Sequence, residues 1–370
     1  MASTVTINDI ARLAGVSKAT VSRVINQKPD VDPETRTKIL RIMDEQGFVP
    51  SVTAAGLAGG RTRLIGVLVP SLTWPLMPEI MRGIGEIVEQ STYDLVLYTV
   101  SHERDRSAMI DRILAARLTE GLLAVYPGQV TGYLSELHSS GYPVVMLDDQ
   151  VVPTGTTPWV GADNRSGAHT AVKHLAQLGH RRIAHIKGRA GYQCSDDRYQ
   201  GYCDALEEAG LAFDPALVVQ GDFLVTGDTT RAHQLNTAGA AALFALAERP
   251  TAIFAASDDV ANGVLQAAAE AELRVPTDVA VVGFDDVAPA AFMRPPLTTV
   301  RQPFFEMGMR ATTLLLDAVN ALRQPHVGWH TAQRNSAPIR EFLPTRLVVR
   351  ESCGAAQRVL AADTLAAVPR

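Results

Sequence analysis

Residues 8–31 read NDIARLAGVSKATVSRVINQKPDV, a stretch that contains two short helical patterns joined at Gly15. In the first pattern the apolar residues recur at the i, i+3, i+4 and i+7 spacing of one helix face, and Thr6 can cap its start. Gly15 is typical of a helix end, and Ser17 is a natural cap for the second helix. The spacing therefore predicts two short helices with a tight glycine turn between them. The apolar positions of the first helix are Ile7, Ile10, Ala11 and Ala14.

A third helix is expected directly after this stretch. Asp32 can cap it, Pro33 suits its first position, and Gly47 marks its end. Three short helices with a tight turn between the first two predict a helix-turn-helix head, whose second helix is sized for the DNA major groove. The expected buried residues of the second and third helices are Val21, Val24, Ile25, Ile39, Ile42 and Met43.

The outer face of the second helix carries residue types that read DNA. Arg23 can donate two hydrogen bonds to guanine O6 and N7, Lys18 can reach the same base edge, and Ala19 can contact a thymine methyl group. Hydroxyl and amide side chains suit phosphate oxygens, which fix register but carry no sequence information. The alternative is a generic three-helix bundle with a solvated polar face. The expected phosphate contacts are Ser17, Thr20, Ser22 and Asn26, and we place Thr6 in the same DNA-contacting set.

Charge and composition support this division of the chain. Residues 1–63 contain nine Lys and Arg and six Asp and Glu, which gives a net charge of +3. The whole chain of 370 residues has a net charge of −5, so the remainder carries −8. A basic head on an acidic body indicates that the head alone meets a polyanion.

The chain has no export signal and no apolar run of about 20 residues, so we expect a cytoplasmic protein. We also expect the three cysteines to be reduced, mostly buried thiols, because they form no CxxC pair.

Four segments of the chain resemble one known family. They are TINDIARLAGVSKATVSRVIN (6–26), DPETRTKILRIMDEQGFVP (32–50), GRTRLIGVLVP (60–70) and PTRLVVRES (344–352). The chain resembles the LacI/GalR family of bacterial transcription repressors from its head through Ser352. The resemblance implies a DNA-binding domain over 1–49, a hinge segment over 50–63, and an effector-binding and dimerisation domain over 64–352. The tail over 353–370 has a helical composition that allows pairing with copies of itself, but with barely two heptads and no clean a/d stripe we expect a flexible, frayed end.

The hinge segment, PSVTAAGLAGGRTR, has too little apolar surface to form a core of its own. In the family the matching segment becomes a short helix on operator DNA and pushes a leucine into the minor groove. Leu57 stands at that position, which implies a wedge that kinks the duplex. The sequence departs from the family pattern at Ala55 and Gly56, where an arginine and a serine are common. The alternative is a plain flexible tether.

The body alternates short apolar runs with helix-length amphipathic segments, which predicts parallel sheets covered by helices on both faces. The resemblance adds two Rossmann-like subdomains with a cleft between them, as in periplasmic sugar-binding proteins. It also implies chain crossings near Asp163, near Pro295 and after the helix over 304–322. The expected strands are LIGVLVP, YDLVLYTV, GLLAVYP, PVVMLDD, RRIAHIKG, AIFAAS and VAVVGFDD.

Ligands of such folds bind at the carboxyl ends of strands, which points to Asp148, Ser257 and Asp285 as effector-binding residues. Arg198 aligns with the effector-binding arginine of the family. Carboxylates, hydroxyls and a bidentate arginine suit a sugar or a related polyol. Trp74 can stack on a pyranose face, or it belongs to the core or the rim. Asp258 and Asp286 are expected to cap the helices that follow them.

The sequence gives an enzyme little support, because it lacks the GxSxG, GxxxxGK[ST] and HExxH motifs. The pairs His169/His174 and His180/His185 lie five residues apart, off the spacing of a helical metal site, so we expect surface or packing roles. No metal or other cofactor is expected. A secreted sugar-binding transport protein is the second alternative, which the DNA-binding head argues against.

We therefore predict a homodimeric repressor that binds a pseudo-palindromic operator, with no membrane partner. A small-molecule effector in the cleft, a sugar or sugar derivative, is expected to change operator affinity. A nucleobase effector, control by a partner protein, and a tetramer remain alternatives.

Overall fold

The computed structural model describes residues 5–25, 28–48, 62–99, 106–116, 118–148, 155–223, 229–322 and 338–355. Within these ranges no helix combines the length and the apolar character needed to cross a membrane. Two predicted DNA contacts, Asn26 and Leu57, lie outside the described residues, as does most of the segment over 50–63.

The head consists of α1 (Ile7–Ala14), α2 (Lys18–Ile25) and α3 (Pro33–Glu45), as predicted. Thr6 and Asp9 form a reciprocal capping box at the start of α1, and Gly15 ends that helix with a φ of 70°. The Ser17 Oγ accepts the Thr20 amide at 3.1 Å, and the Asp32 carboxylate accepts the Thr35 amide at 3.0 Å. The three helices pack around Ile10, Ala14, Val21, Val24 and Ile39, which confirms the predicted core.

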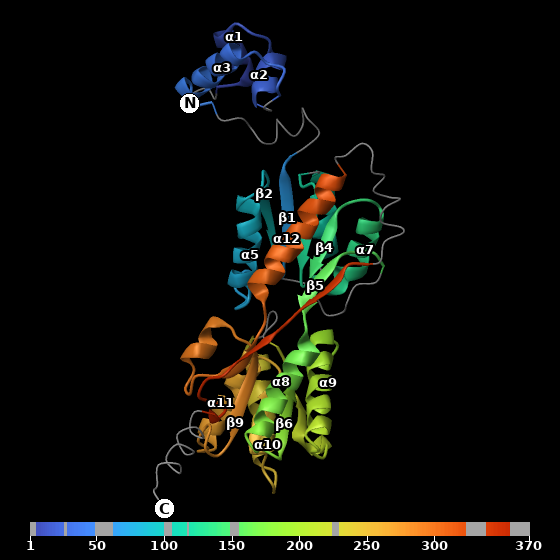
Figure 1. Ribbon diagram of the computed structural model, residues 1–370, viewed down its shortest axis with the longest axis vertical. Coiled ribbons are helices and arrows are strands. Elements are labelled where there is room, and N and C mark those ends of the chain that lie inside the picture. Colours follow the sequence, from blue (N-terminus) through green and yellow to red (C-terminus); the bar gives the residue numbers. More distant parts are fainter. Residues whose placement is uncertain are drawn as a thin grey trace, which may run out of the picture. The chain divides into compact units, whose positions relative to one another are not determined.

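The body contains two six-stranded sheets, each forming the centre of one lobe (Figure 1). In the first lobe the strand order is β11-β5-β4-β3-β1-β2, and the β1–β3, β3–β4, β4–β5 and β5–β11 pairs are parallel. Helix α12 packs against α5 and against β3, β4 and β5 of this sheet. The strands are β1 (Leu64–Val69), β2 (Asp94–Thr99), β3 (Leu122–Val125), β4 (Val144–Leu147), β5 (Trp159–Ala162) and β11 (Arg340–Leu343). The helices are α5 (Met77–Glu89), α6 (Arg106–Ala116), α7 (Thr131–Ser139) and α12 (Phe304–Ala321).

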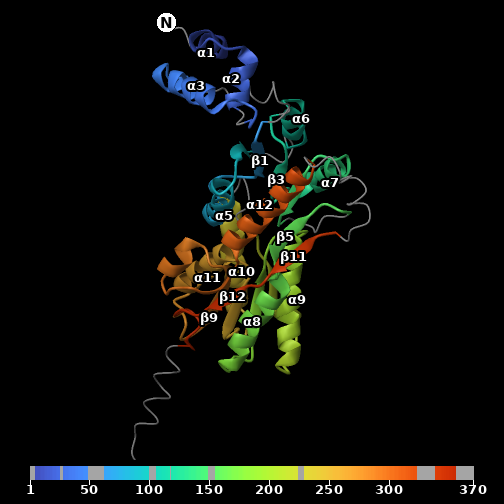
Figure 2. The same ribbon diagram turned by 45° about the horizontal axis from the view of Figure 1, so that its top comes forward.

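In the second lobe the strand order is β12-β10-β9-β8-β6-β7, and only the β10–β12 pair is antiparallel. Helices α8 and α9 lie side by side (Figures 1 and 2), and α10 packs against α11. The strands are β6 (Ile183–Lys187), β7 (Val218–Gln220), β8 (Ala252–Ala255), β9 (Ala280–Asp285), β10 (Thr298–Arg301) and β12 (Arg346–Val348). The helices are α8 (Asn164–Gln177), α9 (Gln193–Glu208), α10 (Thr229–Phe244) and α11 (Asp258–Glu270).

The chain passes between the lobes three times. It leaves the first lobe at Asp163, as expected, where the carboxylate of Asp163 caps α8. The second crossing lies at residues 302–303 and not near Pro295, because the chain first adds β10 to the sheet of the second lobe. The third lies between β11 and β12, whose red ribbon in Figure 1 runs from one sheet to the other.

All seven predicted strands are present in the described part of the chain. Five further strands, β5, β7, β10, β11 and β12, are not among those predicted. Four of them, β7, β10, β11 and β12, contain polar or charged residues, and β5 contains a glycine, so none forms a continuous apolar run like those of β3, β4 and β8. The sheets bury continuous apolar runs, such as β8 and the first five residues of β9, as expected for strands covered on both faces.

The histidines have the packing and surface roles that we expected. His185 is fully buried, stacks on Phe254 and bonds the carbonyl oxygen of that residue at 2.9 Å, and desolvation lowers its pKa to about 3. His169 contacts the Glu208 carboxylate at 2.6 Å on the surface. All three cysteines are free: Cys194 and Cys353 are buried, and Cys203 is half-buried.

Candidate functional site: a DNA-facing helix and an interlobe cleft

Helix α2 of the head turns one face inward and one outward. Val21 and Val24 are buried, whereas Lys18, Ala19 and Arg23 are exposed. The outward face therefore offers two cations and one small apolar contact to an outside partner. The Arg23 guanidinium lies 3.5 Å from the Asp30 carboxylate, with both side chains more than half exposed, so this ion pair is weak and can open for a base edge.

The hydroxyl groups predicted to meet phosphates are also used inside the head. The Ser17 Oγ and Thr20 Oγ1 lie 2.9 Å apart and cap α2, and Ser22 is half-buried. The Thr6 hydroxyl donates to the Asp9 carboxylate at 2.7 Å, and this bond with the backbone bond from Thr6 lowers the pKa of Asp9. Capping groups at helix N-termini stand where a phosphate can be bound, so both roles are compatible.

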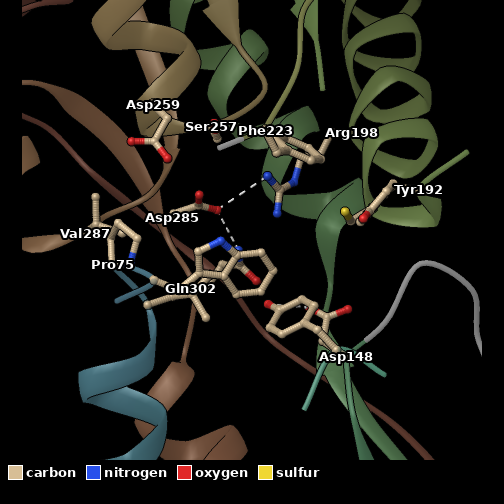
Figure 3. A pocket seen from close by; sticks show the side chains of 14 residues that line it. Pro75, Asp148, Tyr192, Arg198, Phe223, Ser257, Asp259, Asp285, Val287 and Gln302 are labelled. Carbon is tan, nitrogen blue, oxygen red and sulfur yellow. Dashed lines mark hydrogen bonds and ion pairs between the residues drawn. The ribbon is translucent and has the colours of Figure 1, made fainter. Parts of the chain in front are cut away.

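The body holds a cleft lined by residues from both lobes (Figure 3). It encloses about 580 Å³ of space that no atom occupies, part of it open to solvent. All five predicted effector residues line it: Trp74, Asp148, Arg198, Ser257 and Asp285. The first lobe contributes Trp74, Pro75, Leu76, Tyr126 and Asp148, and the second contributes Tyr192, Cys194, Arg198, Phe223, Ser257, Asp259, Asp285 and Val287, with Gln302 at the second crossing.

Arg198 is the most firmly held side chain in the cleft. Its side chain is 4% exposed, its guanidinium lies 3.8 Å from the ring centroid of Phe284, and Nη1 lies 3.4 Å from Asp285 Oδ1. Nε donates to the amide oxygen of Asn164 at 2.9 Å, and Nη1 donates to the carbonyl oxygen of Ala256 at 2.5 Å. The arginine is thus fixed before any ligand arrives, which favours tight binding.

Asp285 lies at the centre of the second-lobe wall (Figure 3). It accepts a hydrogen bond from Gln302 Nε2 at 2.7 Å in addition to its ion pair with Arg198. Burial raises the pKa of this carboxyl, while Arg198 and Gln302 oppose the shift by favouring the charged form.

The first-lobe wall combines an aromatic pair with a carboxylate. Trp74 and Tyr126 meet edge to face with ring centroids 5.1 Å apart, and the Tyr126 hydroxyl donates to Asp148 Oδ2 at 3.2 Å. Trp74 is 9% exposed and belongs to the apolar core as well as to the cleft lining. Its stacking on a sugar ring stays a prediction. Burial raises the pKa of Tyr126 well above its usual range, and the phenol therefore stays a hydrogen-bond donor.

Three cleft residues have a left-handed backbone. Tyr126, Asp148 and Asp285 have φ angles of 47°, 48° and 111°, and Asp286 follows with 57°. Each stands at or directly after the carboxyl end of its strand, where parallel sheets place their ligands.

The predicted capping roles of Asp258 and Asp286 are wrong. Ser257 caps α11 by accepting the Val260 amide at 3.2 Å, because Asp258 is already the first helical residue. Asp258 instead accepts the Thr299 hydroxyl at 2.5 Å and the Val287 amide at 2.9 Å. Asp286 forms ion pairs with Arg301 at 2.5 Å and Arg350 at 2.6 Å. Both acids fix the loop after β9, and neither caps a helix.

Sequence reasoning missed several cleft residues. Tyr126 ends a predicted strand and could have been found by the strand-end rule. Gln302 and Phe223 follow the short strands β10 and β7, which had not been predicted. Asp259 lies in the first turn of α11, where an acid is common for reasons of helix electrostatics and gives no separate signal. Tyr192 precedes α9 without a distinguishing pattern.

Comparisons with known proteins cover almost the whole chain. Residues 6–51 match the family model for bacterial regulatory proteins of the lacI family, and residues 172–353 match that for a periplasmic binding protein-like domain. Catabolite control protein A of Priestia megaterium is 32% identical over 317 residues, which cover 85% of this chain and 93% of that protein.

Two solved structures add similarity in three dimensions. One is a complex of the transcriptional regulator CelR with cellobiose, which is 32% identical with a TM-score of 0.67. The other is the lac repressor dimer bound to operator and the anti-inducer ONPF, which is 28% identical with a TM-score of 0.76. Each similarity covers 94% of this chain and 99% of the matched chain.

Proposed function

Because the chain belongs to the LacI family of bacterial regulatory proteins, we propose that it is a sequence-specific transcription repressor of carbohydrate-related genes. Its operator affinity is changed by a small molecule, a sugar or sugar derivative, that binds in the cleft. The observation that carries the proposal is the outward face of α2, where Lys18, Ala19 and Arg23 stand opposite the buried Val21 and Val24. This is the residue set that reads base edges in the major groove.

The operator is bound by a homodimer at a pseudo-palindromic site. A two-fold dimer presents the same recognition surface to both half-sites, so its symmetry matches that of the DNA. The lac repressor structure, a dimer bound to its operator, supports this arrangement. We assign DNA binding to 1–49, the hinge to 50–63, effector binding and dimerisation to 64–352, and a tail to 353–370.

The effector acts by bridging the two lobes. Asp148 and Trp74 belong to the first lobe, whereas Arg198, Ser257 and Asp285 belong to the second. A ligand that contacts both sets favours the lobe geometry in which all contacts are made at once. It changes operator affinity only as far as its affinities for the two geometries differ. The complex of CelR with cellobiose supports a sugar as ligand.

The protein is a regulator rather than an enzyme, and it acts where the chromosome is, in the cytoplasm. Its relatives are regulators, and the described lining of the cleft combines carboxylates, an arginine and aromatic side chains. Side chains of these types bind a polyol by hydrogen bonds and stacking.

Selection from a random duplex library, followed by quantitative binding to the selected sites, tests DNA recognition. We expect a pseudo-palindromic sequence to bind far more tightly than random DNA. A folded protein without preference for any palindromic duplex contradicts the proposal.

Thermal unfolding against sugars, sugar acids, sugar phosphates and nucleobases tests effector binding. A ligand that binds only the folded state raises the midpoint by mass action. We expect a selective shift that Arg198→Ala abolishes. Since that change leaves Asp285 buried without its cation, Phe223→Leu serves as a milder second variant and should reduce the shift. A shift unaffected by either variant places the ligand elsewhere.

A further inference from the structure

The cleft is unevenly supplied with hydrogen-bonding groups. Most of its strong donors are already used: Arg198 bonds Asn164 and Ala256 and pairs with Asp285, and the Tyr126 hydroxyl donates to Asp148. Arg198 Nη2 has no hydrogen bond within the described residues and stays available to a ligand hydroxyl. Within the described lining, a carboxylate and an amide oxygen also have no donor.

These two acceptors belong to Asp259 and Gln302. Asp259, half-buried at the start of α11, has neither a hydrogen bond nor an ion pair among the described residues. Gln302 is 4% exposed and gives its Nε2 to Asp285, which leaves its buried Oε1 without a partner within the same part of the chain. A buried acceptor left unpaired is costly, so residues of this kind indicate a ligand that supplies donors.

The charge of the lining points the same way. Among the lining residues that the structure describes, three carboxylates, Asp148, Asp259 and Asp285, face one cation, Arg198, which gives this part of the lining a net charge of −2 with all groups ionised. Arg198 and Asp285 compensate each other, and Asp148 receives the Tyr126 hydroxyl. Asp259 forms no ion pair within the described residues; desolvation and the charge of Asp285 raise its pKa to about 6, and His233 opposes this shift. An anionic ligand meets repulsion here, whereas a cation is attracted.

We propose that the cleft binds a polyol carrying a protonated amine, whose ammonium group is held by Asp259. This inference rests on the proposed function and names the chemical class of its effector. The hydroxyl groups of the ligand bond Asp148, Arg198 Nη2 and Gln302 Oε1, and its carbon skeleton lies between Trp74 and Phe223. Figure 3 shows Asp259 and Asp285 on one side of the cleft and Asp148 on the other, so a ligand of sugar size can meet both sides.

Asp259 can also stabilise α11 without a ligand, and the experiment must distinguish that role from ligand binding. An acid in the first turn of α11 stabilises the helix dipole without any ligand. That role makes no distinction between a charged and a neutral ligand. A preference for the amine that disappears with the Asp259 carboxylate is therefore the specific signature of binding.

The test is calorimetric titration of the full-length protein at pH 7.5, where Asp259 is ionised. The probes are D-glucosamine, D-galactosamine, D-mannosamine and 1-amino-1-deoxy-D-glucitol, each compared with the counterpart that has a hydroxyl in place of the amine. N-acetyl derivatives remove the charge but keep the nitrogen, and D-gluconate supplies an anion. Asp259→Asn removes the carboxylate charge, and Glu270→Gln on the exposed end of α11 is the matched control.

We expect at least one amine to bind about tenfold more tightly than its hydroxyl counterpart, because hydrogen bonds to charged groups are stronger. Asp259→Asn should abolish that preference, and Glu270→Gln should keep it. The inference is overturned if no amine binds, if a hydroxyl counterpart or the anion binds as tightly, or if the preference survives in Asp259→Asn. Selective operator binding by the same preparation then shows that the proposed function stands while the ligand class is wrong.

Discussion

Strained backbone and buried charge occur together in the loop after β9. A non-glycine residue with positive φ costs on the order of 1–3 kcal/mol when it is forced into a sparsely populated region, although aspartate tolerates the left-handed region better than most. Asp285 is held there by Arg198 and Gln302, and Asp286 by Arg301 and Arg350. The ion pairs thus fix the backbone that presents Asp285 to the cleft.

At the residue scale, Arg23 and Thr20 should respond differently to truncation. Arg23→Ala should lose roughly 1–3 kcal/mol of operator affinity and relax base choice, because it removes a bidentate base contact. Thr20→Ala should weaken all duplexes about equally, because it removes a phosphate contact. Fluorescence anisotropy with the selected operator, its single-base variants and random DNA measures both. Equal losses for the two variants on specific and random DNA contradict these roles.

Asp259 should make stability depend on pH even without a ligand. Its folded-state pKa, about 6, is above the ordinary 3.8, so the folded state binds the proton more tightly than the unfolded state. Stability therefore falls as pH rises from about 4 to 6. Asp259→Asn removes this loss and should be more stable than the wild type above pH 6, by at most about 3 kcal/mol, with the advantage shrinking toward pH 4.

Urea unfolding of both proteins across this pH range measures the effect. Asp278 is the control of opposite sign: its bonds with Arg274 lower its pKa to about 2, so its contribution is lost as pH falls below about 4. A pH-independent difference between Asp259→Asn and the wild type contradicts the assignment.

At the scale of elements, close packing in the first lobe depends on two glycines. A Cβ on Gly83 of α5 would overlap the carbonyl oxygen of Phe305, and a Cβ on Gly308 of α12 would overlap that of Ile80. The two helix backbones thus approach each other too closely for any side chain. This contact places α12 over the sheet, directly after the second crossing of the chain.

Gly83 and Gly85 of the same helix should therefore respond in opposite ways to alanine. Gly83→Ala should lower the free energy of unfolding by about 1–3 kcal/mol, because the helices must move apart. Gly85→Ala meets open space and should raise it by roughly 0.5–1 kcal/mol through helix propensity. Chemical denaturation of both variants measures this. A destabilised Gly85→Ala would mean that the helix itself, and not the helix contact, is sensitive.

At the scale of the whole molecule, regulation requires two states of the body that differ in operator affinity. The three short crossings are the covalent links between the lobes, so a change in lobe geometry must be absorbed at or near them. To shift such an equilibrium from 1:99 to 99:1, an effector must bind one state about ten-thousandfold more tightly than the other. A cleft with polar groups on both walls can provide such a difference.

The hinge segment should transmit that change to the DNA. Leu57 lies outside the described residues, and its expected role as a minor-groove wedge comes from the family resemblance. Leu57→Ala should weaken operator binding while the head stays folded, because the kinked duplex loses its wedge. Operator titration together with circular dichroism of the same sample measures both effects. Unchanged operator affinity removes the wedge role.

The sequence by itself determined the head, because helix caps and apolar spacing are local signals: Thr6, Gly15, Ser17 and Asp32 each act within four residues of their own position. It also determined the seven predicted strands of the body and four cleft residues, Trp74, Asp148, Ser257 and Asp285, since a strand end is readable along the chain. The family resemblance, rather than periodicity, supplied the two-lobed arrangement and Arg198.

Only the tertiary structure decided the rest, because partners distant in sequence set it. The short strands exist through pairing with other strands, as β12 does with β10, and the presence of β10 in the second sheet places the second crossing at residues 302–303. Asp258 and Asp286 bond residues 15 to 64 positions away, so their local pattern wrongly indicated caps. That Asp259 and the Gln302 Oε1 have no hydrogen-bond partner within the described residues emerges only once those residues have been placed.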